Sequence, residues 1–411
     1  MKKRYIWVLK LISFTVMGAM GAFMNYINLY LEQEVGFTGS QIGIVTMISM
    51  SLVIVVNPIL GYIGDKTGKH VLMLKGAFLL SSLTIAIYSQ MTSFITVLLI
   101  AIMFEAARAS IGPFFDLITS DYCEKVGYDF GRVRVFSSMG FVTTTMLVGF
   151  FIAGVHIPWF DGQMIGFYGF LSVRTAVFVT AVVMLFASFL LMFFVPKPEN
   201  TKGKGAKGQF ERDDIMALLL NKNFQFIVVF ILLSMVALES AKSFVGNHLV
   251  VGLGSAENIV SVMTFVMVLP EFILLPLGSK IIRKVGFKNW YLLAMVTMIL
   301  RMVIYSFTNN IAIFAIASAV HGFGVMTHVA GNIAFIRRVV EPKVLGLAFT
   351  IMASLFVFGR AILSFVYGLL YEHFDGFAVF RVATVLLVCG LIWVVRSKSL
   401  KVIGDEITRE S

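Results

Sequence analysis

Residues 104–141 read FEAARASIGPFFDLITSDYCEKVGYDFGRVRVFSSMGF. Glu105, Arg108 and Asp116 lie inside an apolar stretch long enough to cross a bilayer, and Arg134 begins the next such stretch after a polar turn. A charged side chain at the centre of a membrane helix costs roughly 2.5–3.5 kcal/mol on insertion scales, so such groups persist where they pair or line an aqueous path. The stretch therefore predicts membrane helices whose charges form a functional site, and we expect the chain to move a solute.

The composition of the whole chain supports this interpretation. Of its 411 residues, 59% are hydrophobic and 13% are charged, which excludes an ordinary soluble domain and predicts a protein of the lipid bilayer. The net charge of +11 lies in short loops between apolar segments, so we expect no nucleic-acid partner. Cys123 and Cys389 do not predict a disulfide framework. The first apolar segment has no signal-peptide cleavage motif, and we expect it to be a retained helix.

Apolar runs of about 20 residues predict membrane-spanning helices. There are twelve, beginning near residues 6, 41, 71, 94, 131, 171, 224, 258, 289, 311, 345 and 376. Lys and Arg gather in the loops of one side and are absent from the six opposite loops, a bias that marks the cytoplasmic side. We therefore expect a multi-pass protein of a bacterial cytoplasmic membrane with both termini in the cytoplasm. Interfacial aromatic residues are expected near the span ends, at Trp7, Trp159, Trp290 and Trp393.

A long polar connection divides the predicted spans into two equal groups. It is rich in Gly, Lys and charge, so it is poorly suited to packing. We predict an N-terminal six-helix bundle at 1–196, a cytoplasmic linker at 197–223, and a C-terminal six-helix bundle with a cytoplasmic tail at 224–411. Two parallel repeats around a central substrate site are a known transporter plan. Because two such halves close a site within one chain, we expect a monomer.

The segment GYIGDKTGKH, residues 61–70, carries the most specific motif of the chain. Gly61, Asp65, Gly68 and Lys69 occupy the positions of the loop signature that major facilitator superfamily transporters have between spans 2 and 3. With twelve spans and a central loop, the chain resembles this superfamily, and within it the oligosaccharide/proton symporters related to lactose permease. The resemblance implies an all-α membrane protein with the major facilitator fold of two pseudo-symmetric six-helix bundles. It also implies that these four residues gate the cytoplasmic side, where the acidic one meets a helix N-terminus.

The resemblance implies a substrate site in the first half of the chain. In the family, a glutamate of span 4 and an arginine of span 5 bind sugar hydroxyls, and matching through FGRVR puts Asp116 and Arg134 there. Asp116 is one methylene shorter than the family residue, so its reach differs. The tryptophan that stacks on the sugar ring corresponds to Phe141, which is still aromatic.

The resemblance also implies a sugar and proton network in the second half. The matching residues are Glu271 in span 8, Arg301 in span 9 and His321 in span 10. Two positions depart from the family: Gly324 stands where the proton-carrying carboxylate is expected, and Ser318 replaces the lysine of span 10. Arg360 lies about one helical turn from the family's lysine of span 11. Proton coupling is therefore implied with one element missing.

Helical geometry predicts three polar stripes without any appeal to the family. At 100° per residue, Glu105 and Asp116 point within about 20° of each other, with Arg108 on an adjacent flank. Two further sets share a face in the same way: Asn25, Asn28 and Glu32 in span 1, and His321, His328 and Asn332 in span 10. Stripes that converge would suit a hydroxylated or amide-bearing solute. The alternatives are an intrahelical Glu105–Arg108 ion pair, a structural Asp116–Arg134 bridge, and buried interhelical contacts of Glu271, His321 and His328.

These observations together predict proton-coupled symport of a small polar solute, such as an oligosaccharide or a glycoside, by alternating access. Glu271 is the first candidate for the proton carrier, and Asp116 or Glu105 are the others. Nucleoside/proton symport is an alternative, as is drug/proton antiport, although the Gly-Pro motif common in span 5 of antiporters is absent. A receptor or an intramembrane enzyme belongs to another class. The sequence has no P-loop, metal-binding His motif or nucleophile elbow, so we expect no enzyme, cofactor or metal.

Overall fold

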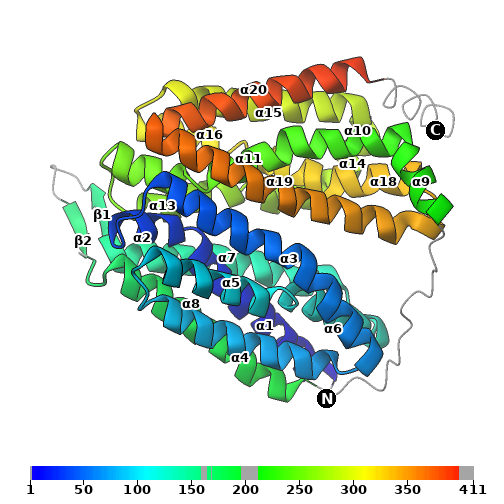
Figure 1. Cartoon of the computed structure of the whole chain (residues 1–411), viewed down its shortest axis with the longest axis horizontal. Coiled ribbons are helices and arrows are strands. Elements are labelled where there is room, and N and C mark those ends of the chain that lie inside the picture. The colour runs from blue at the N-terminus through cyan, green and yellow to red at the C-terminus, as the bar shows by residue number, and fades with distance from the viewer. Residues whose placement is uncertain (1, 159–163, 168, 196–211, 398–411) are drawn as a thin grey trace. The chain divides into compact units, whose positions relative to one another are not determined.

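The computed structural model describes residues 2–158, 164–167, 169–195 and 212–397 (Figure 1). In these ranges, ten helices are long and apolar enough to cross a membrane. Two shorter apolar helical segments, Ile259–Leu274 and Ile311–Met326, fall where the remaining two spans are expected. The predicted all-α membrane fold is therefore confirmed, and the chain is a multi-pass membrane protein.

The helices group into two compact units, each of which is described by itself. The N-terminal unit comprises Met1–Lys207 and Leu249–Thr264. Its elements in Figure 1 are α1 (Lys2–Met24), α2 (Ile27–Gln33), α3 (Gly39–Thr67), α4 (His70–Tyr88), α5 (Phe94–Arg108), α6 (Ile111–Val126), α7 (Phe130–Ala153), β1 (Val155–Pro158), β2 (Met164–Phe167), α8 (Val173–Leu191) and the 3-10 turn η2 (Met192–Phe194). Strands β1 and β2 pair antiparallel, with Val155 opposite Phe167. This hairpin was not predicted, because the sequence there was interpreted only as an outer loop.

The C-terminal unit comprises Gly208–His248 and Phe265–Ser411. Its first half contains α9 (Arg212–Leu220), α10 (Lys222–Ile231), the π-helix η3 (Leu232–Val236), α11 (Ala237–Lys242), α12 (Val245–Asn247) and α14 (Glu271–Val285). The π-helix η4 (His248–Gly252) and α13 (Ile259–Val268) are divided between the units, and most of each belongs to the N-terminal unit. The rest contains α15 (Phe287–Phe307), α16 (Ile311–Ser318), α17 (His321–Met326), the π-helix η5 (Thr327–Asn332), α18 (Ile333–Val339), the 3-10 turn η6 (Pro342–Val344), α19 (Leu345–His373) and α20 (Gly376–Arg396). The chain passes from one unit to the other after Lys207, within η4 and within α13.

The predicted domain boundaries, 1–196, 197–223 and 224–411, stay a prediction. Residues 196–211 of the linker lie outside the described residues, and the following segment forms α9. Leu249–Thr264 groups with the N-terminal unit although it follows the linker in sequence. Within that unit, the Asn258 side-chain amide donates a hydrogen bond to the Gly154 carbonyl over 3.0 Å.

Polar caps explain where many of the helices begin. The side chain of Thr38 accepts a hydrogen bond from the Gln41 backbone N–H, and the Gln41 side chain accepts one from the Thr38 N–H, forming a capping box at the start of α3. Other caps accept from backbone N–H groups in the first turn: Ser93 of α5, Asp129 of α7, Ser172 of α8, Asn221 of α10, Asn310 of α16 and Asp375 of α20. These caps satisfy N–H groups that have no intrahelical partner, so they fix the starts of the spans.

Glycines let α1 and α7 pack closely in the N-terminal unit. A Cβ at Gly140 would lie 2.1 Å from the Phe14 carbonyl oxygen, and one at Gly21 would lie 2.3 Å from the Phe141 carbonyl oxygen. Close backbone approach of this kind is the usual way in which membrane helices associate. A hydrogen bond of 2.6 Å between Ser13 and Ser137 joins the same two helices. The two helices are therefore held at a fixed distance.

Several predicted spans are interrupted where a polar candidate residue lies. Broken helices in membranes expose backbone groups, and transporters use such breaks at their binding sites. The interrupted spans and the residues at their breaks are Tyr5–Gln33 with Asn25, Phe94–Val126 with Arg108, Ile259–Leu274 with Glu271, and Ile311–Met326 with His321. The π-helix η3 ends directly before α11, and His328 and Asn332 lie within η5. Such π segments frequently occur at functional sites.

The tryptophan residues agree only in part with the predicted interfacial belt. Trp7 and Trp393 are 56% and 40% exposed, as interfacial residues should be. Trp290 lies in the first turn of α15, near a span end as predicted, but it is 1% exposed and its indole N–H donates to the Thr327 hydroxyl over 3.0 Å, so its side chain packs inside the protein. Trp159 lies outside the described residues.

Candidate functional site

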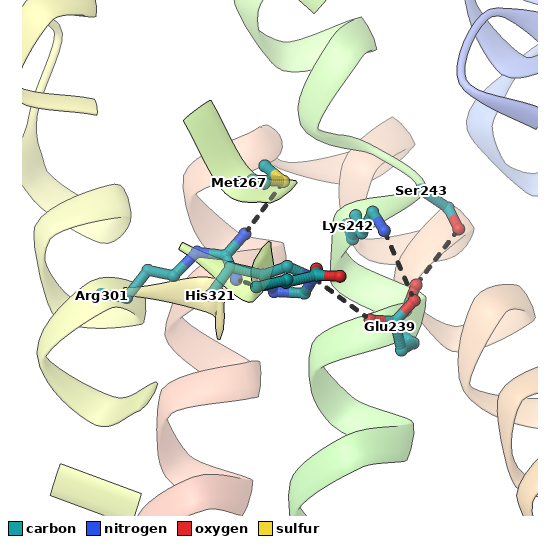
Figure 2. Close-up of polar contacts among 7 residues, drawn as sticks. Glu239, Lys242, Ser243, Met267, Arg301 and His321 are labelled. Atoms are coloured by element: carbon teal, nitrogen blue, oxygen red, sulfur yellow. Dashed lines mark hydrogen bonds and ion pairs between the residues drawn. The ribbon is translucent and has the colours of Figure 1, made fainter. Parts of the chain in front are cut away.

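Charged and titratable side chains from four helices meet inside the C-terminal unit. We call this set the C-terminal cluster; its members are Glu239 and Lys242 of α11, Glu271 of α14, Arg301 of α15 and His321 of α17. Figure 2 shows His321 between Arg301 on one side and Glu239 on the other. The arrangement therefore brings together the three predicted network residues Glu271, Arg301 and His321, along with two that were not predicted.

Arg301 determines which nitrogen of His321 carries a proton. Arg301 is 2% exposed, and its Nη1 lies 2.8 Å from His321 Nδ1. A guanidinium has N–H donors and no acceptor, so His321 Nδ1 accepts this hydrogen bond and bears no proton. The imidazole is then neutral, with its proton on Nε2. The Nη2 of Arg301 also lies 3.7 Å from the sulfur of Met267, as Figure 2 shows.

The protonated face of His321 is directed at two carboxylates. Nε2 lies 3.9 Å from Glu239 Oε1 and 3.9 Å from Glu271 Oε1. Both distances exceed a direct hydrogen bond and are short enough for one bridging water. An imidazole N–H equidistant from two carboxylates can donate a hydrogen bond to either one and so favours whichever of them is ionised.

The two carboxylates differ in their cationic neighbours. Lys242 Nζ lies 3.7 Å from Glu239 Oε2, one helical turn along α11. Glu271, within the described part of the chain, has only the neutral His321 inside ion-pair distance. The carboxylate charge of Glu271 is therefore less well balanced by a nearby positive charge than that of Glu239. Because the side chains of Glu239 and Glu271 remain 19% and 15% exposed, both are also accessible to small species.

Arg360 adds a further positive charge near this cluster. It lies near the middle of α19 and interacts electrostatically with Glu239, while its guanidinium carbon is 5.7 Å from the centroid of the Phe356 ring. Its buried Nε has no hydrogen-bond partner among the described residues. A cation–π contact contributes about 0.5–2 kcal/mol. This is less than the roughly 2.5–3.5 kcal/mol that a mid-membrane arginine costs on insertion scales, so the ring alone does not compensate Arg360.

Two of the ion pairs in the described part of the N-terminal unit join predicted site residues. Glu105 and Arg108, three residues apart at the end of α5, are joined by contacts of 2.8 Å and 2.5 Å. Arg134 Nη1 of α7 lies 3.0 and 2.8 Å from the two carboxylate oxygens of Asp116 of α6. The side chains of this second pair are 60% and 45% exposed, so the pair can open without a large desolvation cost. The structure thus brings both predicted pairs together, and their roles stay predictions.

The remaining candidates of this unit are tied into the contact between α1 and α7. Asn25 donates its side-chain amide to the Thr145 hydroxyl over 3.0 Å and to the Gly21 carbonyl over 3.1 Å. Asn28 is buried at 9% exposure, and Phe141 is partly buried against the hydrophobic core. The amide of Asn25 therefore has a local structural partner in addition to its predicted binding role.

His328 and Asn332 lie together in the C-terminal unit, inside η5. The imidazole of His328 stacks on Phe356 with 5.2 Å between ring centroids, and its Nδ1 is 3.5 Å from the Asn332 side-chain nitrogen. Asn332 accepts a hydrogen bond from the Tyr291 hydroxyl over 2.9 Å. These contacts explain why Asn332 is buried and fixed in orientation, and they leave its predicted role in binding untested.

The gating motif forms the end of α3 and the start of α4. Gly68 caps α3 with φ +65°, a conformation that favours glycine, and its N–H donates to the Gly64 carbonyl. Lys69 is exposed directly before α4, and Gly61 lies within α3. The side chain of Asp65 lies outside the described part of the structure. The glycine at position 68 therefore has a physical reason, and the gating role stays a prediction.

Sequence reasoning missed Glu239 and Lys242. Both lie in the segment LESAK at the end of an apolar span. The rule that identified residues 104–141, charge inside an apolar span, applies to this segment equally. That signal marks both residues as candidates, but it does not show that they lie inside the unit.

Interrupted membrane helices around an internal charged cluster are typical of membrane transporters. A family model described as the MFS_1 like family matches residues 6–382. The chain belongs to this family, and hence to the major facilitator type of transporter that the motif at 61–70 predicts.

Two curated relatives are similar to almost the whole chain. The maltose permease of Geobacillus stearothermophilus is 22% identical over 401 residues, which cover 97% of this chain and 96% of the relative. An uncharacterized transporter of Bacillus subtilis (strain 168), YwbF, is 21% identical over 374 residues, which cover 90% and 88%. Both are transporters, which agrees with a small-molecule substrate and with the prediction that the chain is not an enzyme.

Solved structures share the fold. A mutant of the nucleoside transporter NupG superposes with a TM-score of 0.81 at 16% identity, covering 95% of this chain and 99% of that one. A mutant of the peptide transporter POT gives a TM-score of 0.72 at 12% identity, covering 98% and 95%. At these identities the likeness concerns the fold alone, and it agrees with the predicted major facilitator architecture.

Proposed function

We propose that the protein is a secondary active transporter that couples proton entry to uptake of a small polar solute, such as an oligosaccharide or a glycoside, by alternating access. The C-terminal cluster carries this proposal, because ionisable groups inside a membrane span mark ion and substrate paths. The protein would act as a monomer in a bacterial cytoplasmic membrane, with both termini in the cytoplasm. The maltose permease relative supports a sugar as the solute.

Glu271 carries the coupling proton in this proposal. Glu239 keeps a negative charge because Lys242 lies 3.7 Å away, whereas Lys242 acts on Glu271 only from beyond 4.0 Å and the neutral imidazole of His321 is the nearest described partner of Glu271. Protonation of Glu271 removes a carboxylate charge from the cluster and changes which conformation is favoured. His321, held by Arg301, directs its Nε2–H at Glu271 and favours the ionised carboxylate, and Glu271, whose side chain is 15% exposed, exchanges its proton with solvent directly.

Asp116 and Arg134 supply the solute site of the N-terminal unit. Both side chains are more than 40% exposed, so solute hydroxyl groups can insert into the pair, accept from the guanidinium and donate to the carboxylate. Phe141 offers a ring surface, and the amides of Asn25 and Asn28 offer further donors and acceptors. The pairing of Glu105 with Arg108 favours a structural role for this couple.

A nucleoside is the second candidate solute. The superposition with the nucleoside transporter NupG supports it, at a TM-score of 0.81. A nucleoside offers ribose hydroxyls to the same donors and acceptors and a base to Phe141. The two candidates share the coupling mechanism and differ in the ring that the site accepts.

Proteoliposomes with an imposed pH gradient, acid outside, test the proposal. Labelled maltose, a panel of glycosides and uridine are offered, and solute-dependent alkalinisation of an unbuffered exterior is recorded beside uptake. We expect accumulation of one solute class and a matching alkalinisation, both lost in Glu271→Gln and both kept in Glu124→Gln, which alters an exposed carboxylate of α6. Accumulation without alkalinisation, or none of the panel taken up, contradicts proton symport of a sugar or nucleoside.

A further inference from the structure

The buried charges of the C-terminal unit do not balance. Within the described part of the cluster and its surroundings, Lys242, Arg301 and Arg360 face two carboxylates, and His321 is neutral because of its bond to Arg301. One positive charge is therefore in excess. In the N-terminal unit, by contrast, each of the two arginines of the predicted site contacts its own carboxylate.

Arg360 carries the excess charge. No carboxylate of the described residues lies within 4.0 Å of its guanidinium, and its buried Nε makes no hydrogen bond there. The guanidinium instead lies over the ring of Phe356. Within the described part of the chain, Arg301 also has a buried Nε without a partner, but it differs from Arg360 because its Nη1 is bonded to His321 and its Nη2 contacts Met267. Arg381 differs too, since it is exposed near the start of α20. Arg360 is thus a mid-span cation that still has free donors.

We infer that the transported solute is an anion and that Arg360 binds its carboxylate group. The inference rests on the proposed function and specifies its solute as an acidic sugar or glycoside. A guanidinium offers parallel N–H groups that match a carboxylate in two hydrogen bonds, and this pairing strengthens where water is excluded. A bound carboxylate would satisfy the free donors of Arg360 and neutralise the excess charge.

The same charge balance links the solute to the proton. When Glu271 takes up a proton, the cluster loses one negative charge, and its positive excess grows from one to two. Anion binding then becomes more favourable, and by reciprocity a bound anion favours protonation of Glu271. Proton and carboxylate therefore enter together, and a solute with one negative charge crosses with one proton without net charge movement.

Three ligands that differ only at one carbon test the inference. Glucose, glucuronate and glucose 6-phosphate carry a hydroxymethyl group, a carboxylate and a phosphate at that position, and maltose with its uronic acid analogue forms a second pair. Binding to the purified full chain is measured by thermal shift and by titration. We expect the carboxylate member of a pair to bind at least about tenfold tighter than the neutral member, which corresponds to one charge-assisted hydrogen bond lost or gained.

Variants of Arg360 separate binding from folding. Arg360→Gln should abolish the carboxylate preference, Arg360→Lys should keep most of it because the charge remains, and the matched control Arg381→Gln should leave it unchanged. Variants are compared only after size-exclusion profiles show monodisperse protein. Equal affinity for neutral and acidic members, tighter binding of the phosphate, or a preference that survives Arg360→Gln overturns the inference. If neutral and acidic members bind equally and pH-driven uptake of a neutral solute persists, the inference fails and the proposed function stands.

Membrane potential gives an independent test in proteoliposomes. A potassium gradient with valinomycin imposes an inside-negative potential at constant pH on both sides. Uptake of a monoanion with one proton is electroneutral, so we expect no stimulation. A neutral solute with one proton carries positive charge inward, and potential-driven accumulation would therefore overturn the inference while supporting proton symport.

Discussion

Arg301 Nη1 lies 2.8 Å from His321 Nδ1, and this hydrogen bond keeps the imidazole of His321 neutral, with its proton on Nε2. An imidazolium would direct a second N–H at an arginine that has nothing to accept it with. His321 is therefore a neutral donor to the carboxylates of Glu239 and Glu271, each 3.9 Å from Nε2. The proton that is exchanged during transport therefore belongs on a carboxylate, and the imidazole serves as a hydrogen-bond donor to that carboxylate.

Substitution of His321 tests this assignment. His321→Gln keeps an acceptor for Arg301 and a donor for the carboxylates, so we expect pH-driven uptake within about tenfold of the wild type. His321→Leu leaves the charged Arg301 donor unsatisfied, at a cost of about 1.5–3 kcal/mol, and should reduce uptake about 10- to 100-fold. The initial rate of labelled solute uptake is the measurement. Equal loss in both variants would mean that ionisation of the imidazole itself is required.

Asp116→Asn separates a solute site from a structural bridge. Exposed ion pairs contribute about 0–1 kcal/mol to stability, so we expect a Tm close to that of the wild type. Solute binding should nonetheless fall at least about tenfold, because the carboxylate no longer accepts hydroxyl donors with a full charge. The matched control is Asp121→Asn, in an exposed pair with Lys125 on the same helix. A drop in Tm with unchanged binding would identify a structural bridge instead.

Glu239 and Lys242 should depend on each other for stability. Removal of one partner from a poorly solvated pair leaves an uncompensated charge, whereas removal of both costs little. We therefore expect Glu239→Gln to lower the Tm measurably, and the double variant Glu239→Gln with Lys242→Gln to recover part of the loss. A double-mutant cycle in thermal unfolding measures the coupling. Additive effects of the two substitutions would show that the pair, at 3.7 Å, contributes no interaction energy.

Close packing of α1 on α7 predicts a position that tolerates no side chain. A Cβ at Gly140 would lie 2.1 Å from the Phe14 carbonyl oxygen, so Gly140→Ala forces the helices apart. Overpacking of this kind costs typically about 1–3 kcal/mol, and we expect a lower Tm. Gly76→Ala in α4 is the control, because nothing lies within 4 Å of its Cβ position and alanine favours a helix. A Gly140→Ala protein as stable as the control would contradict the packing described for these helices.

Much of the fold was predictable from the sequence because a bilayer imposes simple rules. Apolar length predicts the spans, and starts near residues 94, 311, 345 and 376 agree with helices that begin at Phe94, Ile311, Leu345 and Gly376. The motif at 61–70 predicted the family, which the family match at 6–382 confirms. These signals are local or periodic, so they need no knowledge of packing.

The candidate site was predictable only in part. Glu271, Arg301 and His321 were found by resemblance, and the structure brings them together. Glu239 was missed because a charge near the end of a span is usually an interfacial residue, and only the π-helix η3 and the packing of α11 show that it is internal. Trp290 was assigned to the interface because it lies near a span end. The sequence does not show that its N–H donates to the Thr327 hydroxyl inside the protein.

The most direct measurement of the central claim compares two transport modes of Glu271→Gln in the same proteoliposomes. Exchange of labelled for unlabelled solute at equal pH requires binding and alternating access but no net proton movement, whereas accumulation against a gradient requires the proton. If Glu271 carries the coupling proton, the variant keeps exchange and loses pH-driven accumulation, while Glu124→Gln keeps both. Accumulation by Glu271→Gln at the wild-type level would contradict the account.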